Sequence, residues 1–305
     1  MMNVLVTGAT GFVGGHLCSA LARAGHAVGA MTRQPDDYRG SGRPVYGDIG
    51  DPASLAEALA GRDAAYYLVH SLAEPDFGDR DRDGARAFGQ AAAAGGVDQV
   101  IYLGGLGDED DDLSEHLGSR REVERILMDT APTTALRAGI VIGDGGISWE
   151  ILRQLVERLP VMITPRWVQT RTQPIAIDDA VALLVGVLGR DEAIGAAFDA
   201  GGPDTLTYRQ MLETVARLTG RHRLIVPVPL LSPRLSSHWL RLITDVDLPT
   251  ARALVDSLAN EVVVRDHRID HLVGHRTMGF EAAARKALKA RADRRRLMPG
   301  AHASP

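Results

Sequence analysis

The most constraining feature of this chain is a short apolar run followed by three glycines spaced three residues apart. Residues 3–7 predict a strand, and Gly8, Gly11 and Gly14 precede a helical pattern. In such a strand–turn–helix the first glycine permits the tight turn, and the second lets the backbone approach a pyrophosphate. The third lets the helix pack closely on the strand. The helix start offers free N–H groups to phosphates. The sequence therefore predicts a dinucleotide site near the N-terminus.

Strand and helix patterns alternate over the first 200 residues or so. Helix ends are marked by Asp51-Pro52 and Gly61, and by the capping residues 207–210 and Gly220. Further helices are expected from near Gly84 to Gly95 and from Asp178 to Leu188. Strands are expected at 3–7, 27–32, 44–46, 65–70, 100–103, 134–142 and 196–199. Short connections between such elements predict a Rossmann-type, doubly wound parallel α/β sheet.

The pattern changes after residue 200, where prolines cluster and strand signals become sparse. We expect residues 1–200 to form the dinucleotide-binding domain and residues 201–305 a smaller, mostly helical substrate lobe. The segment 146–173 interrupts the alternation and is expected to join that lobe. The Arg-rich end, from about residue 291, is interpreted as a solvated tail, with a nucleic-acid arm as the alternative.

Composition limits the partners of the chain. The net charge is −5, so no general field attracts nucleic acid or an anionic membrane. No apolar run reaches the ~18 residues that span a bilayer. The single cysteine, Cys18, is expected in the core and fits a reducing cytoplasm. We expect a cytoplasmic protein whose partner is a small-molecule substrate or another protein, and the oligomeric state stays open.

The end of the second predicted strand discriminates between the two dinucleotides. An NAD site usually carries Asp or Glu there, ~20 residues past the glycines, to bind the ribose. Residues 30–34 contain no acid, and Arg33 stands where a 2′-phosphate needs a cation. NADP(H) is therefore favoured over NAD(H). The alternative for Arg33 is a position in solvent or on the adenine, and Asp48 is expected by the adenine or in a surface turn.

At this point the chain resembles the short-chain dehydrogenase/reductase superfamily. It is most similar to the atypical branch of NmrA-like and nucleoside-diphosphate-sugar-epimerase-like NAD(P)-binding proteins. The matching segments are residues 7–14, 47–51, 67–71, 136–143 and 174–179. The resemblance implies cofactor contacts from Gly8, Thr10, Gly11, Phe12, Val13, Gly14, Arg33, Asp48, Ile49, Leu68, Val69, His70, Leu103, Gly104 and Arg120.

The chain departs from that family at the catalytic positions. Active members carry a serine after the fifth strand and a Tyr-x-x-x-Lys helix. Here Gly104 replaces the serine, His116 the tyrosine and Arg120 the lysine, and the first lysine of the chain is Lys286. His116 and Arg120 are the candidate catalytic residues, because imidazole can act as a general acid and Arg120 keeps the charge. Arg120 would lower the pKa of His116. A solvated helix face is the alternative for the pair.

Other candidates are less specific. Arg166, Trp167 and Arg171 would line a site for an anionic or flat substrate, or lie on the surface. His70 is expected either at the nicotinamide half or as the end of a strand. The acidic run 108–112 suits a divalent cation or a solvated loop, and no metal site is predicted.

Two classes of function follow. The first is an atypical NADP(H)-dependent oxidoreductase that acts on a small carbonyl or enone without the usual Tyr/Lys pair. The second is a non-catalytic NADP(H)-sensing regulator or an accessory or assembly protein. A nucleotide-sugar epimerase is disfavoured, since that chemistry also uses the missing pair.

Overall fold

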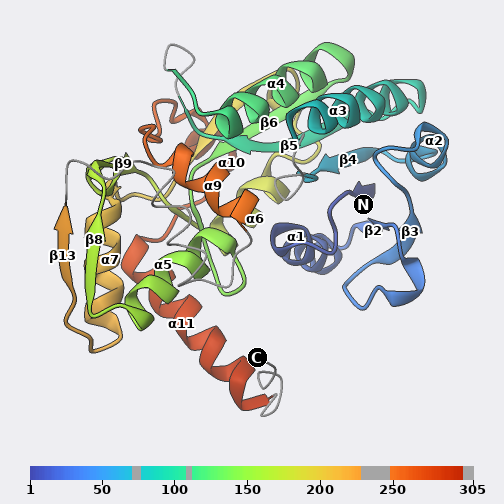
Figure 1. The fold of residues 1–305 in the computed structure, drawn as a ribbon. Helices are drawn as coiled ribbons and strands as arrows, with labels where there is room; N and C mark the ends of the chain where they lie inside the picture. Colours follow the sequence, from blue (N-terminus) through green and yellow to red (C-terminus); the bar gives the residue numbers. More distant parts are fainter. Residues whose placement is uncertain (71–76, 108–111, 228–247, 298–305) are drawn as a thin grey trace.

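The computed structural model describes residues 1–70, 77–107, 112–227 and 248–297. Its centre is a parallel sheet of seven strands in the order β11-β6-β5-β4-β1-β2-β3 (Figure 1). The strands are β1 (Asn3–Val6), β2 (Ala27–Thr32), β3 (Arg43–Tyr46), β4 (Ala64–Tyr67), β5 (Gln99–Gly105), β6 (Thr133–Ala138) and β11 (Ala197–Ala200). This confirms the predicted Rossmann-type α/β architecture.

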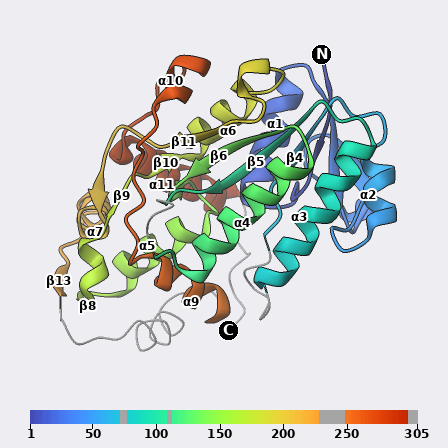
Figure 2. The ribbon, with the colours of Figure 1, turned by 90° about the horizontal axis from the view of Figure 1, so that it is seen from above.

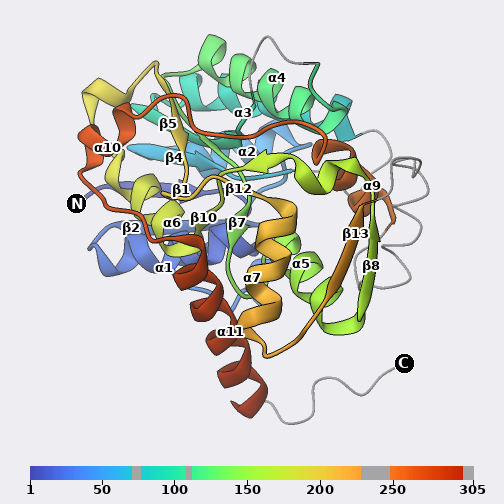
Figure 3. The same cartoon turned by 90° about the vertical axis from the view of Figure 1, so that its left-hand side faces the viewer.

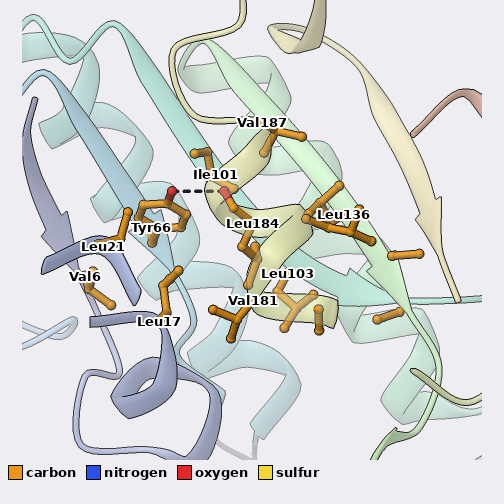
Figure 4. Close-up of a cluster of buried hydrophobic side chains, with 14 of the residues drawn as sticks. Val6, Leu17, Leu21, Tyr66, Ile101, Leu103, Leu136, Val181, Leu184 and Val187 are labelled. Carbon is orange, nitrogen blue, oxygen red and sulfur yellow. Dashed lines mark hydrogen bonds between the residues drawn. The ribbon is translucent and has the colours of Figure 1, made fainter. Parts of the chain in front are cut away.

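Helices cover both faces of the sheet (Figures 1 and 2). One face carries α2 (Pro52–Leu59), α3 (Phe77–Ala94) and α4 (Glu115–Thr130), and the other carries α1 (Phe12–Arg23) and α6 (Ile177–Gly186). Alternate residues of β1 enter the two cores, since Val4 and Val6 face α1 while Leu5 faces α2. In the core of Figure 4, the Tyr66 hydroxyl donates to the carbonyl oxygen of Leu184 at 3.0 Å and ties β4 to α6.

A second group of elements lies beside the carboxyl edge of the sheet (Figure 3). Its helices are α5 (Ile147–Arg158), α7 (Tyr208–Leu218), α9 (Leu248–Ser257) and α11 (Phe280–Leu297), whereas α10 (Arg268–Val273) packs on β11 and α6. Its paired strands are β7 (Val141–Ile142) with β10 (Ile175–Ala176), β9 (Arg171–Thr172) with β12 (Leu206–Thr207), and β8 (Val161–Thr164) with β13 (Leu224–Pro227). Three short helices complete the described elements: η1 (Pro35–Asp37) lies between β2 and β3, η2 (Arg166–Gln169) follows β8, and η3 (Asp191–Ala193) precedes β11. Trp149 of α5 is fully buried in the separate core of this group.

Three predicted boundaries were wrong. The strand expected at 134–142 is two strands, because the chain leaves the sheet at Gly139, where a Cβ would lie 3.1 Å from the carbonyl oxygen of Gln173. The helix expected from Gly84 begins at Phe77. The C-terminal helix continues past Arg291 to Leu297, and Arg291 pairs with Glu150 at 3.2 Å. No helix within the described ranges is both long and apolar enough to cross a bilayer.

Candidate functional site

The glycine turn closes tightly between β1 and α1. Gly8 has φ +63°, and a Cβ on it would lie 2.9 Å from the carbonyl oxygen of Leu68. A Cβ on Gly14 would overlap the Gly8 carbonyl group, whose carbon lies 2.8 Å away. Gly11 is the N-cap of α1, and no side chain accepts a hydrogen bond from the helix start. The first N–H groups of α1 therefore have no side-chain acceptor among the described residues, as suits a turn that holds a phosphate group.

The other predicted cofactor residues gather at the carboxyl ends of neighbouring strands, where ligands bind in folds of this kind. Thr10, Phe12 and Val13 flank the start of α1, Leu68, Val69 and His70 follow β4, and Leu103 and Gly104 end β5. Asp48 and Ile49 follow β3, and the Asp48 carboxylate accepts the Gly50 N–H at 2.9 Å in a turn. Arg33 follows β2 and is exposed, and it forms no ion pair within the described ranges.

A cavity of about 370 Å³ lies beside this edge of the sheet, between β5, β6 and helices α4, α5, α7 and α9. Apolar side chains make most of its wall: Phe12, Leu103, Leu106, Leu117, Ile140, Val141, Ile147, Ile151, Leu152, Leu155, Leu212, Leu254, Leu258 and Val262. His70, His116, Arg120 and Tyr208 are the titratable residues of that wall. A cavity of this kind suits an apolar ligand with one polar group.

His70 and His116 form a hydrogen-bonded chain with Asp81. The Nδ1 atom of His70 lies 2.8 Å from Oδ2 of Asp81, and its Nε2 atom lies 3.2 Å from Nδ1 of His116. The two imidazole rings stack with centroids 4.9 Å apart. Asp81 is buried on α3, so the chain leads from a buried carboxylate to the cavity.

Burial controls the charge of the two histidines in the Asp81–His70–His116 hydrogen-bonded chain. Burial first, then the neighbouring His70 and Arg120, lower the pKa of His116 to about 3, against the opposing effect of Asp81. Burial and Arg120 also lower the pKa of His70, and Asp81 again opposes the shift. The predicted lowering of the His116 pKa by Arg120 is in the right direction, but desolvation is the larger cause. Both imidazoles are therefore uncharged at neutral pH.

Arg120 lies against the end of β5. Its Nη2 atom donates to the Leu103 carbonyl oxygen, and its guanidinium carbon lies 5.2 Å from the centroid of the Tyr102 ring. The Tyr102 hydroxyl donates to the Arg120 carbonyl oxygen at 3.0 Å. A Cβ on Gly104 would lie 2.9 Å from that ring. The stacked ring therefore leaves no room for a serine at this position.

A buried ion pair fixes α4, which carries His116 and Arg120, to the sheet. The Glu124 carboxylate accepts from Nη2 of Arg137 on β6 at 2.6 Å and from Nη1 of Arg121 at 3.4 Å. Arg121 also donates to the Gly107 carbonyl oxygen at 2.7 Å. Such pairs orient elements even where they add little net stability.

The three predicted substrate residues separate in space. Trp167 lines the cavity and packs edge-on against Tyr208, with ring centroids 5.8 Å apart. Arg171 is exposed outside the cavity and pairs with Glu261 at 2.8 Å, so it does not line the site. Arg166 begins η2, and its side chain is outside the described structure.

The acidic run and Cys18 are the remaining candidates. Residues 108–111 of the acidic run lie outside the described residues, and the Asp112 carbonyl oxygen accepts from Nδ2 of Asn260 at 3.0 Å. No group of potential metal ligands occurs among the residues that the structure describes. Cys18 is fully buried in α1, as predicted, and burial raises the pKa of its thiol.

Asp81 was missed by the sequence analysis, although a signal existed. The buried residues of α3 include Phe77, Asp81, Ala85 and Phe88, which follow one helical stripe. An acid on an apolar stripe indicates a buried partner. Placing the helix start at Gly84 left Asp81 outside the helix and concealed this pattern.

Comparison with known proteins identifies the family of the chain. A family model described as NAD(P)H-binding matches residues 8–159. A (4-alkanoyl-5-oxo-2,5-dihydrofuran-3-yl)methyl phosphate reductase of Streptomyces griseus is 32% identical over 231 residues, covering 72% of this chain and 74% of the relative. A ceramide reductase of Caulobacter vibrioides is 29% identical over 269 residues, covering 83% and 77%.

A solved structure extends the likeness in fold. An NADPH-dependent quinone oxidoreductase of Escherichia coli, complexed with NADPH, aligns with a TM-score of 0.75 at 22% identity over 92% of this chain and 98% of that one. The chain belongs to the NAD(P)H-binding, reductase-like family.

Proposed function

We propose that this protein is an NADP(H)-dependent oxidoreductase that interconverts a carbonyl or enone and its reduced form on a largely apolar molecule. The observation that carries the proposal is the Asp81–His70–His116 chain, which ends in an apolar cavity beside the glycine turn. When bound, the nicotinamide dinucleotide supplies hydride transfer. Residues 8–14 would hold its pyrophosphate, and residues after β3 and β4 and at the end of β5 would contact the rest.

The preference for NADP(H) rests on Arg33. This arginine follows β2, is exposed, and has no carboxylate partner among the described residues. Its guanidinium is therefore free to make charge-assisted hydrogen bonds with a 2′-phosphate. No acid stands at the end of β2 to bind an unphosphorylated ribose.

The hydrogen bonds determine which atom of His116 meets the substrate. The ionised Asp81 carboxylate accepts the His70 Nδ1 proton, so His70 Nε2 accepts the His116 Nδ1 proton. The Nε2 atom of His116 then carries a lone pair and remains for the substrate. In this neutral state His116 takes the hydroxyl proton of an alcohol.

One added proton converts the same chain into an acid. The positive charge rests on His70 beside the Asp81 carboxylate, while His116 stays neutral with a proton on Nε2. When that proton passes to a carbonyl oxygen, the proton on His70 Nε2 returns to His116 Nδ1. The buried carboxylate thus opposes part of the desolvation that disfavours a charged imidazole, although the pKa of His70 stays below its ordinary value. Arg120 keeps the end of β5 in place through the Leu103 carbonyl oxygen.

The cavity favours a substrate with an apolar body. Helices α5, α7 and α9 supply apolar walls, His70, His116 and Arg120 lie at the end near β5 and α4, and Tyr208 lies on α7 beside Trp167. We propose that residues 146–173 and 201–297 form the substrate lobe, because α5, α7 and α11 share one core. The reductase names of the relatives support this direction.

Turnover tests the proposal directly. We expect NADPH oxidation with long-chain or cyclic apolar ketones, enones or quinones, and reduction that accelerates as the pH falls below 7, because the acid form is then more populated. His116→Ala should lower kcat by at least about 10²-fold while the NADPH Kd is retained. Full activity of His116→Ala would exclude it as the proton donor.

A non-catalytic NADP(H) sensor or assembly protein is the second candidate. The absence of the usual Tyr/Lys pair and the strongly lowered pKa of His116 favour it. Tight NADPH binding without turnover of any of these substrates, together with a partner whose binding depends on NADPH, would establish the sensor. A partner that binds regardless of NADPH would indicate the assembly role.

A further inference from the structure

The strands β8 and β13 form a two-stranded parallel ribbon at the end of the molecule opposite α2 (Figures 1 and 2). Met162 and Ile225 point inward and are buried. The outward residues are all aliphatic, with exposed fractions of 47% for Val161, 55% for Ile163, 60% for Leu224 and 39% for Val226. Val161 pairs with Leu224 and Ile163 with Val226, so the four side chains form one contiguous patch, here termed the ribbon patch.

Two arginines lie directly before β13, at the edge of the ribbon patch. Residues 158–177 and 214–227 contain six arginines and no Asp or Glu, but Arg171 and Arg217 pair with Glu261 and Glu281. Arg221 donates to the Glu157 carbonyl oxygen at 2.8 Å and Arg223 to the Val156 carbonyl oxygen at 2.7 Å. Neither pairs with a carboxylate in the described ranges, so both charges remain. The net charge of −5 therefore does not describe this end of the molecule.

We propose that the ribbon patch docks on the surface of an anionic lipid bilayer. Aliphatic side chains enter the acyl boundary while neighbouring arginines meet the phosphates, which is how interfacial binders combine the two forces. A stable protein interface buries about 800 Å² per partner, more than four partly exposed side chains offer.

The position of β8 connects the ribbon patch to the cavity. The strand lies between Leu155 of α5 and Trp167 of η2, and both residues line the cavity. Docking would bring the wall of an apolar cavity to the phase in which apolar substrates dissolve. The docking itself is independent of the proposed reductase activity, since it rests on the ribbon patch and its charge alone.

Vesicle co-sedimentation of the full chain tests the proposal. We expect binding to phosphatidylcholine vesicles that contain phosphatidylglycerol, and much weaker binding to phosphatidylcholine alone or at high salt. The double variant Ile163→Ser/Leu224→Ser should reduce the partition coefficient by about tenfold or more. Leu297→Ser is the matched control, because Leu297 is 82% exposed on α11, away from the patch, and it should bind like the parent.

Three results would overturn docking. The first is that the parent protein does not bind anionic vesicles, and the second is that the double variant binds them equally well. The third is a change of oligomeric state in the double variant without lipid, which would make the patch a protein interface. Thermal unfolding and NADPH titration of the double variant check that it is folded. Vesicle binding and oligomeric state are both measured without turnover. Failure of docking is therefore distinguishable from failure of the proposed activity.

Discussion

The Oδ2 atom of Asp81 and the Nδ1 atom of His70 lie 2.8 Å apart, and the carboxylate is buried where it makes this bond. A buried acid with an imidazole partner stabilises the protonated imidazole. Asp81→Asn preserves the shape of the side chain and removes its charge. We expect kcat for reduction to fall about 10²-fold and its pH dependence to move to lower pH. Steady-state kinetics between pH 5 and 8 measure both effects.

Asp79→Asn is the matched control for this variant. Asp79 is on the same helix, is exposed, and pairs with Arg82 at 2.6 Å rather than with the histidines. It should leave kcat and the pH profile unchanged. If Asp81→Asn lowered the melting temperature without moving the pH profile, Asp81 would be a structural residue. Proton transfer along the Asp81–His70–His116 chain would then be refuted.

Gly14→Ala should abolish dinucleotide binding. The added methyl group would overlap the Gly8 carbonyl group, so α1 must move away from the turn. We expect a loss of about 3 kcal/mol in unfolding free energy and no measurable NADPH binding by calorimetry. Gly15→Ala is the control, because its Cβ would lie 3.8 Å from the Ala9 carbonyl oxygen. Normal NADPH affinity in Gly14→Ala would show that the turn does not hold the pyrophosphate.

Arg33→Ala should affect one dinucleotide more than the other. Loss of charge-assisted hydrogen bonds to a 2′-phosphate raises the Kd of NADPH by about 10- to 100-fold. The Kd of NADH should stay within about twofold, because NADH carries no such phosphate. Arg23→Ala, at the far end of α1, controls for a general loss of positive charge. Parallel losses for both dinucleotides would contradict a phosphate contact by Arg33.

Acid should destabilise the protein through His116. Its pKa of about 3 in the folded state lies below the ordinary value, so the unfolded chain binds the proton first as the pH falls. The associated stability is complete above pH 7 and decreases below 6.5, by about 2 kcal/mol at pH 5. His116→Gln should flatten this decrease in denaturant unfolding curves, whereas His222→Gln, on the surface, should leave it intact. Identical slopes for parent and His116→Gln would argue against a buried neutral imidazole.

Much of the fold is predictable because its strands carry local signals. Parallel strands buried on both faces read as apolar runs, and glycines such as Gly61 and Gly220, which adopt positive φ, mark where helices stop. The strands β8 and β13 are too short to show the apolar–polar alternation that identifies a strand in the sequence. They form because residues 161–164 and 224–227 pair with each other in space.

The site is predictable only in part. The glycine turn follows from local sequence, and His116 was found by its place in a family pattern. Its partner His70 is 46 residues away, and their contact depends on how α4 packs over the ends of β4 and β5. No local sequence pattern encodes that packing. Asp81 was overlooked because the predicted helix began at Gly84, three residues after it.

The surroundings of Arg120 affect how this chain could be re-engineered. Installing tyrosine at 116 and lysine at 120 would recreate the pair of active relatives on paper. Lysine has no planar fork to reach the Leu103 carbonyl oxygen while stacking on Tyr102. Tyrosine would leave His70 Nε2 without its ring partner. A return to the common chemistry therefore requires His70, Tyr102, His116 and Arg120 to change together, and single exchanges along that route should pass through inactive proteins.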